Sequence, residues 1–496
     1  MAKILLINPN KWGRGITSIW IPAHTALLRS RGHQVQLFDC TFFKNWTVDE
    51  TAFNTSNEQY KKTDYHQFIN YSDEDVTKSL QKRVDTFQPD IIFWSALSSH
   101  IHGEGEYVNV QYGYELVSQV NTKALLITAG LQITARPEEG FARFPKTNYF
   151  IAGESEFVLA DIADALNSPE KIIGLKGVVW KKGEKAVVNP PQPIISNLDS
   201  IPQYDYSVFD SSVFWRPYNG EVVKAVDYEL SRGCIYTCSY CVETVIQRYY
   251  GFDQSSSKSG ALTEPKKYLR AKSGKRVYEE LKMLNSELGI TLVRCQDTNF
   301  LTINRATLKE LADLLDAEPL NIKLYVETRV DRISPSDVEL LKRLRVDGVG
   351  TGIELSSEAF RTDFLNRFAS TDKLEENVAL LKKAGIKCTA YNIIGLPKEN
   401  EEMILDTIRL NRRIQPDNIT VAFYSPYIGT QQAERGVSEK YFDDYEYHVD
   451  GQLRTVSHSS LLDAKTLNFY KKYFNRFVRQ GLDDLAALKK QEGLVS

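Results

Sequence analysis

The stretch YELSRGCIYTCSYC, residues 228–241, holds three cysteines within eight residues: Cys234, Cys238 and Cys241. Their spacing is C-x3-C-x2-C, and Gly233 before them lets the backbone turn away from the preceding strand. A short loop of this kind brings three thiolates within reach of one metal ion or one metal cluster. An iron–sulfur cube normally takes four thiolates, one for each iron. Three local cysteines therefore predict a [4Fe–4S] cluster with one iron open to another ligand.

A structural zinc site is the main alternative for this loop. Closed zinc sites need a fourth Cys or His, and the histidines considered for that role, His102 and His448, lie far away in the chain. Unrelated reduced thiols are a second alternative. The other cysteines, Cys40, Cys295 and Cys388, are scattered, which is typical of small core residues and not of a disulfide framework.

The region around the loop, residues 223–430, alternates strands with helices. One of the helices, KRVYEELKMLNSELG (275–289), carries apolar residues at three- and four-residue spacing and ends at a glycine, as C-caps often do. Six βα repeats are too few for a closed eight-fold barrel and predict a partial (β/α)6 barrel, whose active site would lie at the carboxyl ends of the strands. The predicted strands are 224–232, 291–297, 322–330, 347–354, 386–394 and 418–425.

Residues 1–170 are predicted to form a separate flavodoxin-like (Rossmann-type) domain, so the whole chain is of the α/β class. Short Val-, Ile- and Leu-rich strands alternate with helices, which indicates a doubly wound parallel sheet. Such sheets bind ligands outside the carboxyl ends of their strands. Residues 171–222 are predicted as a β-containing linker, and 431–496 as a mostly helical C-terminal region. The predicted strands of the first domain are 3–10, 33–40, 89–97, 123–130 and 148–154.

Composition narrows the class of protein. The chain has 496 residues, 42% hydrophobic and 25% charged, with a net charge of −3. These values are ordinary for a soluble protein and give no global electrostatic reason to bind nucleic acid or an anionic membrane. No apolar run approaches the 18 or more residues of a membrane span, and no signal-peptide pattern is present. We therefore expect a cytoplasmic protein with reduced thiols.

The motif C-x3-C-x-aromatic-C after a strand resembles the signature of the radical S-adenosylmethionine (SAM) superfamily. Over residues 1–430 the chain resembles the cobalamin-binding-domain-containing radical SAM enzymes. The resemblance implies that SAM binds the open iron through its methionine amino and carboxylate groups, and that electron transfer yields a 5′-deoxyadenosyl radical. Tyr240 holds the aromatic position, which in the family lies against the adenine; ordinary packing is its alternative role.

Later strand ends carry further segments that resemble family motifs, one for each strand. The residues thereby implied to contact SAM are Glu327 and Arg329 near the methionine carboxylate, Glu354 at the ribose, and Gly395 beside the adenine. For Glu327 a buried ion pair across strands is an equal alternative. The segments are QDTNF (296–300), VETRVDRIS (326–334), GTGIELSS (350–357) and NIIGLP (392–397).

The N-terminal domain resembles the family's cobalamin-binding domain through AGLQITARPEE (129–139) and AGESEFVLADIADAL (152–166). The resemblance implies bound cobalamin. Methyltransferase-type cobalamin domains carry an axial His after the first strand, whereas this chain has NPNKWGRG (8–15) there; many radical members also lack that His. A degenerate domain that binds no corrinoid is the alternative. The small residues assigned on this resemblance to the corrinoid's nucleotide tail are Ser95, Ser98, Gly130 and Gly153.

Taken together, the motifs predict a cobalamin-dependent C-methyltransferase of a small biosynthetic intermediate. One SAM would regenerate methylcobalamin, and a second would give the radical that abstracts a substrate hydrogen. The alternatives are a cyclisation, rearrangement or oxidation on the same scaffold, and a non-catalytic iron–sulfur or corrinoid sensor. A tRNA methylthiotransferase would need more N-terminal cysteines than Cys40. Expected partners are a small-molecule substrate and an electron donor such as flavodoxin or ferredoxin, with neither membrane nor nucleic acid; no catalytic residue is assigned.

Overall fold

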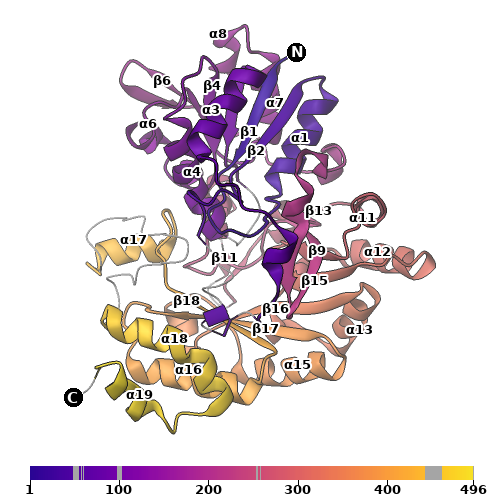
Figure 1. Ribbon diagram of the computed structural model, residues 1–496. Helices are drawn as coiled ribbons and strands as arrows, with labels where there is room; N and C mark the ends of the chain where they lie inside the picture. The colour runs from indigo at the N-terminus through magenta and orange to yellow at the C-terminus, as the bar shows by residue number, and fades with distance from the viewer. Residues whose placement is uncertain are drawn as a thin grey trace.

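Two β-sheets covered by helices form an upper and a lower domain (Figure 1). The computed structural model describes residues 1–48, 55–56, 58–59, 61–97, 103–252, 255–256, 259–441 and 461–494. Both sheets are built mainly from parallel strands joined by helices, which confirms the predicted α/β class.

The first sheet has the strand order β2-β1-β3-β4-β5-β6-β7. Its first five strands are parallel and follow 2-1-3-4-5, the order of flavodoxin-like sheets, as predicted. Segments such as KILLIN are almost wholly buried because helices cover both faces. The parallel strands are β1 (Lys3–Asn8), β2 (Gln34–Asp39), β3 (Ile91–Trp94), β4 (Leu125–Ala129) and β5 (Tyr149–Ile151). The helices are α1 (Trp20–Ser30), α3 (Val76–Phe87), α4 (Gly103–Val117), α5 (Leu131–Ala135), α6 (Gly140–Arg143), α7 (Glu156–Asp164) and α8 (Pro169–Ile172).

The segment predicted as a linker begins with a hairpin that extends this sheet. β6 (Val178–Lys182) pairs antiparallel with β5, and β7 (Lys185–Val188) pairs with β6. The rest of the linker passes between the domains, where Tyr204 and Tyr206 are fully buried in the largest core cluster. Short 3-10 turns occur in this linker and elsewhere: η1 (Tyr65–Phe68), η2 (Pro137–Glu139), η3 (Leu198–Ser200), η4 (Tyr206–Val208), η5 (Ser211–Phe214), η6 (Phe300–Thr302) and η7 (Val330–Arg332).

The second sheet has the order β18-β17-β16-β15-β14-β9-β8. Six of its strands are parallel and form the predicted partial barrel; the seventh, β8, is antiparallel to β9. Helix α11 starts at the Ser273 cap and ends at Gly289 with φ +68°, as its sequence predicts. The strands are β8 (Trp215–Tyr218), β9 (Glu221–Tyr228), β14 (Leu292–Cys295), β15 (Lys323–Glu327), β16 (Val346–Glu354), β17 (Lys387–Ile394) and β18 (Asn418–Phe423). The outer helices are α11 (Gly274–Leu288), α12 (Arg305–Ala317), α13 (Pro335–Arg343), α15 (Thr371–Lys383) and α16 (Glu401–Ile414).

Small elements surround the barrel mouth, and three helices end the chain. Helix α18 (Ala464–Gln480) packs its aromatic face on α16 and β18, so this part of the C-terminal region, predicted to be mostly helical, covers the barrel. The other two C-terminal helices are α17 (Gln431–Ser438) and α19 (Leu485–Gln491). The small elements are β10 (Ser231–Arg232), β11 (Ser255–Ser256), β12 (Ala261–Leu262), β13 (Arg270–Ala271), α9 (Glu243–Tyr249), α10 (Pro265–Tyr268) and α14 (Glu358–Asp363).

Buried ion pairs join the two domains directly beneath the cysteine loop. Arg232 on β10 lies 3.2 Å from Glu154 and 2.5 Å from Glu156 of the first domain, and 2.7 Å from Glu229. Arg270 on β13 lies 2.7 Å from Glu154. All five side chains are less than 10% exposed. This network fixes the first domain to the strand that leads into the cysteines.

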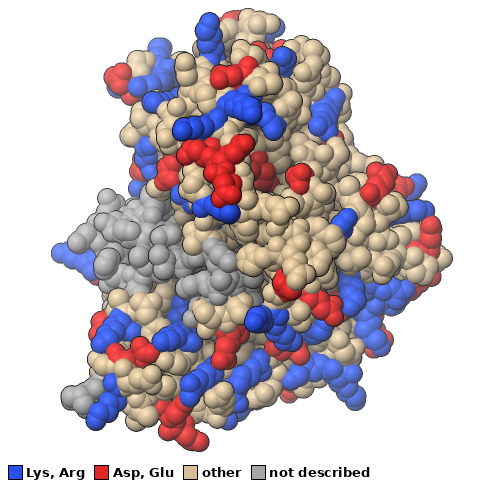
Figure 2. Space-filling view, viewed as in Figure 1, with Lys and Arg blue, Asp and Glu red and all other residues tan. Residues whose placement is uncertain are grey.

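The surface has a mixed charge. In Figure 2, Lys and Arg side chains and Asp and Glu side chains are interspersed over the barrel helices, in keeping with the small net charge. Among the helices of the described residues, none is long and apolar enough to cross a membrane.

Candidate functional site

A cavity of about 570 Å³ lies between the two domains and extends from the carboxyl ends of the barrel strands into the barrel interior. The barrel contributes the cysteine loop and the strand ends. The first domain contributes the loop that follows β1, with Asn8, Asn10, Trp12 and Arg14. Since both kinds of sheet bind ligands at this edge, this cavity is the candidate ligand site.

Cys234, Cys238 and Cys241 all line the cavity. Burial raises the pKa of Cys234 to about 12, and burial also raises the pKa of Cys241. The thiolate forms therefore need bound cations, as an iron–sulfur cluster would provide. Gln247 on α9 holds the loop, because its amide donates to the carbonyl oxygens of Cys234 at 2.9 Å and Tyr236 at 3.1 Å.

The three thiols border a wide cavity, which leaves room beside them for a further ligand. Three thiolate donors at such a cavity fit an iron–sulfur cluster with one open iron, and the identity of the metal stays a prediction.

Tyr240 and Glu354, two residues assigned to SAM from the sequence, meet in the cavity. The Tyr240 hydroxyl donates to Glu354 Oε1 at 2.8 Å, and burial raises the pKa of Tyr240. Arg367 Nη1 lies 3.8 Å from the same carboxylate. Glu354 has φ +61°, so the backbone at the end of β16 is strained. The structure thus holds both side chains at one point, and their contact with SAM stays a prediction.

Glu327 and Arg329 also line the cavity but do not pair with each other. Arg329 is held by Asp331 through hydrogen bonds of 3.0 and 2.7 Å, and its guanidinium lies 4.2 Å from the ring centroid of Tyr236. Glu327 accepts from the Tyr391 hydroxyl at 3.2 Å, and burial raises its pKa. The two predicted SAM contacts therefore have separate surroundings, with Arg329 beside the cysteine loop and Glu327 deeper in the barrel.

Gly395 lies at the turn after β17 and is not among the residues that line the cavity. Its φ of +82° requires glycine, and its N–H donates to Glu399 at 2.5 Å. A Cβ there would approach Leu467 of α18. The nearest cavity-lining residue of this segment is Ile393. An adenine contact at Gly395 itself stays a prediction that its position does not favour.

The residues assigned to cobalamin do not share one environment. Ser95 and Gly130 face each other at the ends of β3 and β4, where a Cβ on Gly130 would lie 3.1 Å from Ser95 Oγ. This Oγ is buried and has no hydrogen-bond partner among the described residues. Gly153 packs instead against Tyr249 and Tyr250 of α9. None of these three lines the 570 Å³ cavity.

Ser98, the fourth residue assigned to cobalamin, lies outside the described residues, as do His102 and His448.

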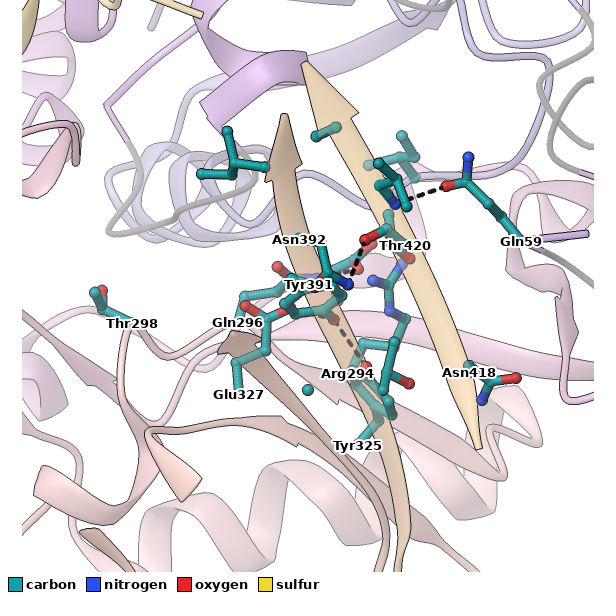
Figure 3. Close-up of a pocket in the computed structure, with 18 of the residues that line it drawn as sticks. Gln59, Arg294, Gln296, Thr298, Tyr325, Glu327, Tyr391, Asn392, Asn418 and Thr420 are labelled. Atoms are coloured by element: carbon teal, nitrogen blue, oxygen red, sulfur yellow. Dashed lines mark hydrogen bonds between the residues drawn. The ribbon is translucent and has the colours of Figure 1, made fainter. Parts of the chain in front are cut away.

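The interior of the partial barrel brings Glu327, which was predicted from its motif, together with polar residues that were not assigned to the site. Figure 3 shows Arg294, Gln296, Glu327 and Tyr391 gathered around one space inside the curved sheet. Tyr325 Oη lies 2.8 Å from the hydroxyl oxygen of Tyr391. The sequence does indicate that these polar side chains share one face of the sheet, because they alternate with apolar residues along strands predicted to be buried.

Comparison with known proteins agrees with this geometry. The model of the radical SAM superfamily matches residues 228–410. An uncharacterized methyltransferase of Pyrococcus horikoshii is 26% identical over 368 residues, which cover 74% of this chain and 73% of that protein. An anaerobic magnesium-protoporphyrin IX monomethyl ester cyclase of Cereibacter sphaeroides is 26% identical over 426 residues, covering 83% of this chain and 64% of the cyclase.

A solved structure has the same two-domain fold. It is the radical S-adenosylmethionine methyltransferase TsrM from Kitasatospora setae, with cobalamin and a [4Fe–4S] cluster bound; its TM-score is 0.65 at 17% identity, covering 89% of this chain and 78% of that one. The family match begins at the end of β9, takes in the cysteine loop and reaches α16, so it coincides with the barrel. Residues 228–410 therefore form a radical SAM domain, and the fold of the whole chain is similar to that of the cobalamin-bound radical SAM methyltransferase TsrM.

Proposed function

We propose that this enzyme is a cobalamin-dependent radical SAM methyltransferase that acts on a carbon atom of a small molecule. The observation that carries the proposal is the single cavity bordered by the three cysteines on one side and by the first domain on the other. When bound there, the cluster and SAM supply a carbon-centred radical, and cobalamin supplies a methyl group. Relatives that include a methyltransferase support this reading.

The chain's own residues would hold these groups in separate places. Cys234, Cys238 and Cys241 hold the cluster, while Tyr240 and Glu354 form a hydrogen-bonded pair beside it. The first domain closes the opposite side and excludes water. In the flavodoxin-like sheet, Ser95 and Gly130 lie side by side and stay our candidates for contact with the nucleotide tail; Ser95 Oγ is buried and has no hydrogen-bond partner among the described residues. Among the described residues, the loop after β1 lines the cavity without a histidine.

The same scaffold also supports a second reaction class. One relative is a cyclase, so ring formation without methyl transfer is the alternative. An electron donor such as flavodoxin or ferredoxin would serve either reaction.

The test uses anaerobically purified, cluster-reconstituted protein supplied with hydroxocobalamin. We expect one cobalt per chain, formation of 5′-deoxyadenosine and S-adenosylhomocysteine with a low-potential reductant, and transfer of a trideuteromethyl group from labelled SAM to a metabolite in a small-molecule extract. Deoxyadenosine without cobalt, and with no labelled product, would favour the cyclase alternative. An intact cluster without any SAM cleavage would favour the sensor.

A glycine pair tests the corrinoid site itself. Gly130→Ala places a methyl group 3.1 Å from Ser95 Oγ at a φ of +120°, whereas Gly32→Ala introduces a similar backbone strain (φ +82°) with nothing within 4 Å. We expect the first variant to lose bound cobalt while keeping its iron, and the second to keep both. Equal cobalt contents would contradict the assignment.

A further inference from the structure

The inner end of the cavity has a wall that is unusual for a barrel interior. Barrel cores are normally filled by branched apolar side chains. Here Asp227, Arg294 and Tyr325 occupy paired positions on β9, β14 and β15, so they stand side by side on one face of the sheet. All three line the cavity, together with Glu327 and Tyr391. A polar wall at a packed core is typical of a site that binds a polar molecule.

Strand β16 makes room for this wall because it carries glycines where the neighbouring strands carry side chains. A Cβ on Gly350 would lie 2.5 Å from Tyr391 Oη and 2.8 Å from Tyr325 Oη. A Cβ on Gly348 would lie 3.0 Å from Tyr218 Oη. The tyrosine hydroxyls therefore lie across the bare backbone of β16, and Arg294 faces the remaining space (Figure 3).

The charge at this end is positive. Arg216 on β8 lies 2.7 Å from Asp227, whose other oxygen accepts from Gln296 at 2.7 Å. Burial lowers the pKa of Arg216, as do the nearby guanidiniums of Arg294 and Arg14. Three arginines, two from the barrel sheet and one from the first domain, thus lie near two carboxyl groups, Asp227 and Glu327, which leaves an excess of positive charge. Such an arrangement favours an anion, because guanidinium groups bind carboxylates with two parallel hydrogen bonds.

Two buried hydrogen-bond donors that line the cavity also point to an oxygen-bearing ligand. Arg216 Nε and Gln59 Nε2 are buried, and within the described part of the chain neither has a hydrogen-bond partner. Both residues line the cavity, and both side chains are less than 10% exposed. A buried donor without a partner is costly, and a ligand that accepts hydrogen bonds removes that cost.

We propose that the inner end of the cavity is the substrate subsite and that it binds a carboxylate of the substrate, with Arg294 and Arg14 as its anion contacts and Gln59 as an additional donor. The inference rests on the proposed function and narrows it to small organic acids. The carboxylate anchors the molecule at the barrel's inner end, so that the opposite part of the substrate points toward the cysteine loop.

The experiment measures binding, without turnover, to the anaerobic enzyme that carries its cluster, with saturating SAM and no reductant. The probes are benzoate and phenylacetate, each compared with its primary amide by saturation-transfer NMR titration. We expect each carboxylate to bind at least tenfold more tightly than its amide. Arg294→Gln should reduce this preference to less than about twofold, and Arg413→Gln, which removes an exposed arginine paired with Glu375 on the barrel surface, should leave it intact.

Arg14→Gln gives a second test from the other domain and should also weaken carboxylate binding at least fivefold. Amides that bind as well as the acids, no binding of either probe, or a preference that survives in both cavity variants would overturn the subsite. Cobalt content and SAM cleavage are measured separately on the same samples. If the protein binds no cobalt and cleaves no SAM but still prefers carboxylates to amides, the proposed function is refuted and the subsite stands.

Discussion

Replacement of Arg232 by methionine tests whether the two domains are held together by buried charge. In the native protein this guanidinium faces three carboxylates. Glu154 would retain Arg270 at 2.7 Å, and Glu229 would retain the Tyr204 hydroxyl at 2.5 Å. Glu156, 1% exposed, would lose its ion pair altogether. Removing one partner of a buried ion pair costs about 3–5 kcal/mol.

The expected effect on thermal stability follows from that cost. For a domain of this size, each kcal/mol changes the melting temperature by about 2–4 °C, so the Arg232→Met variant should melt on the order of 10 °C lower. The assay is anaerobic thermal denaturation followed by circular dichroism, with iron content measured in parallel. Arg248→Met is the matched control, because Arg248 and Glu434 form an exposed pair worth about 1 kcal/mol or less.

The pH dependence supplies an independent check. Burial alone would raise the pKa of Glu156, but Arg232 and His24 outweigh burial and hold it below its usual value. The native carboxylate therefore contributes stability that is present at neutral pH and lost on acidification. In the variant, Glu156 stays buried without Arg232, so its pKa is raised. The loss of stability relative to the native protein is therefore greatest at high pH and becomes smaller as the Glu156 carboxyl takes up a proton. The difference in melting temperature between the native protein and the variant should become smaller as the pH falls from 8 to 6. A difference below 2 °C at pH 8, or one that grows as the pH falls, would refute the reasoning.

Three further variants test the site. Cys238→Ala should lose the cluster and SAM cleavage, measured by iron analysis and 5′-deoxyadenosine formation, whereas alanine at the buried Cys388, outside the cavity, should retain both. Tyr240→Phe removes the 2.8 Å hydrogen bond to Glu354 and should weaken SAM binding roughly tenfold in equilibrium dialysis; Tyr278→Phe, which removes a hydroxyl on α11, should not. Gly350→Ala pushes a methyl group against the Tyr391 and Tyr325 hydroxyls and should lower the melting temperature by the equivalent of about 1–3 kcal/mol, so an unchanged value would contradict the packing described here.

Much of the fold could be predicted from the sequence because its strands are apolar and regularly spaced. The eleven predicted parallel strands lie within a few residues of their observed positions. Apolar runs such as KILLIN are stable only when they are buried, and a central strand of the sheet buries them. The hairpin of β6 and β7 and the strand β8 were not specified, because they are short and partly exposed, and their patterns resemble a loop.

The site could be predicted only where it follows a local motif. The three cysteines lie within eight residues, so their spacing alone brings them together. The contact between Arg232 and Glu156 joins residues 76 positions apart, and local periodicity carries no information about it. Gly153 was assigned to cobalamin from its place at a strand end; it packs against Tyr249 and Tyr250, a long-range contact that the local sequence does not indicate, and its cobalamin contact stays a prediction.

The ion pairs between the domains also determine how small molecules can enter and leave. A hinge-like rotation that parted the domains would expose Arg232 and Arg270 to solvent only after separating them from Glu154 and Glu156. Because breaking buried charge pairs is costly, we expect cofactor and substrate exchange to proceed by local shifts at the cavity rim, with the two halves of the enzyme remaining docked throughout the catalytic cycle.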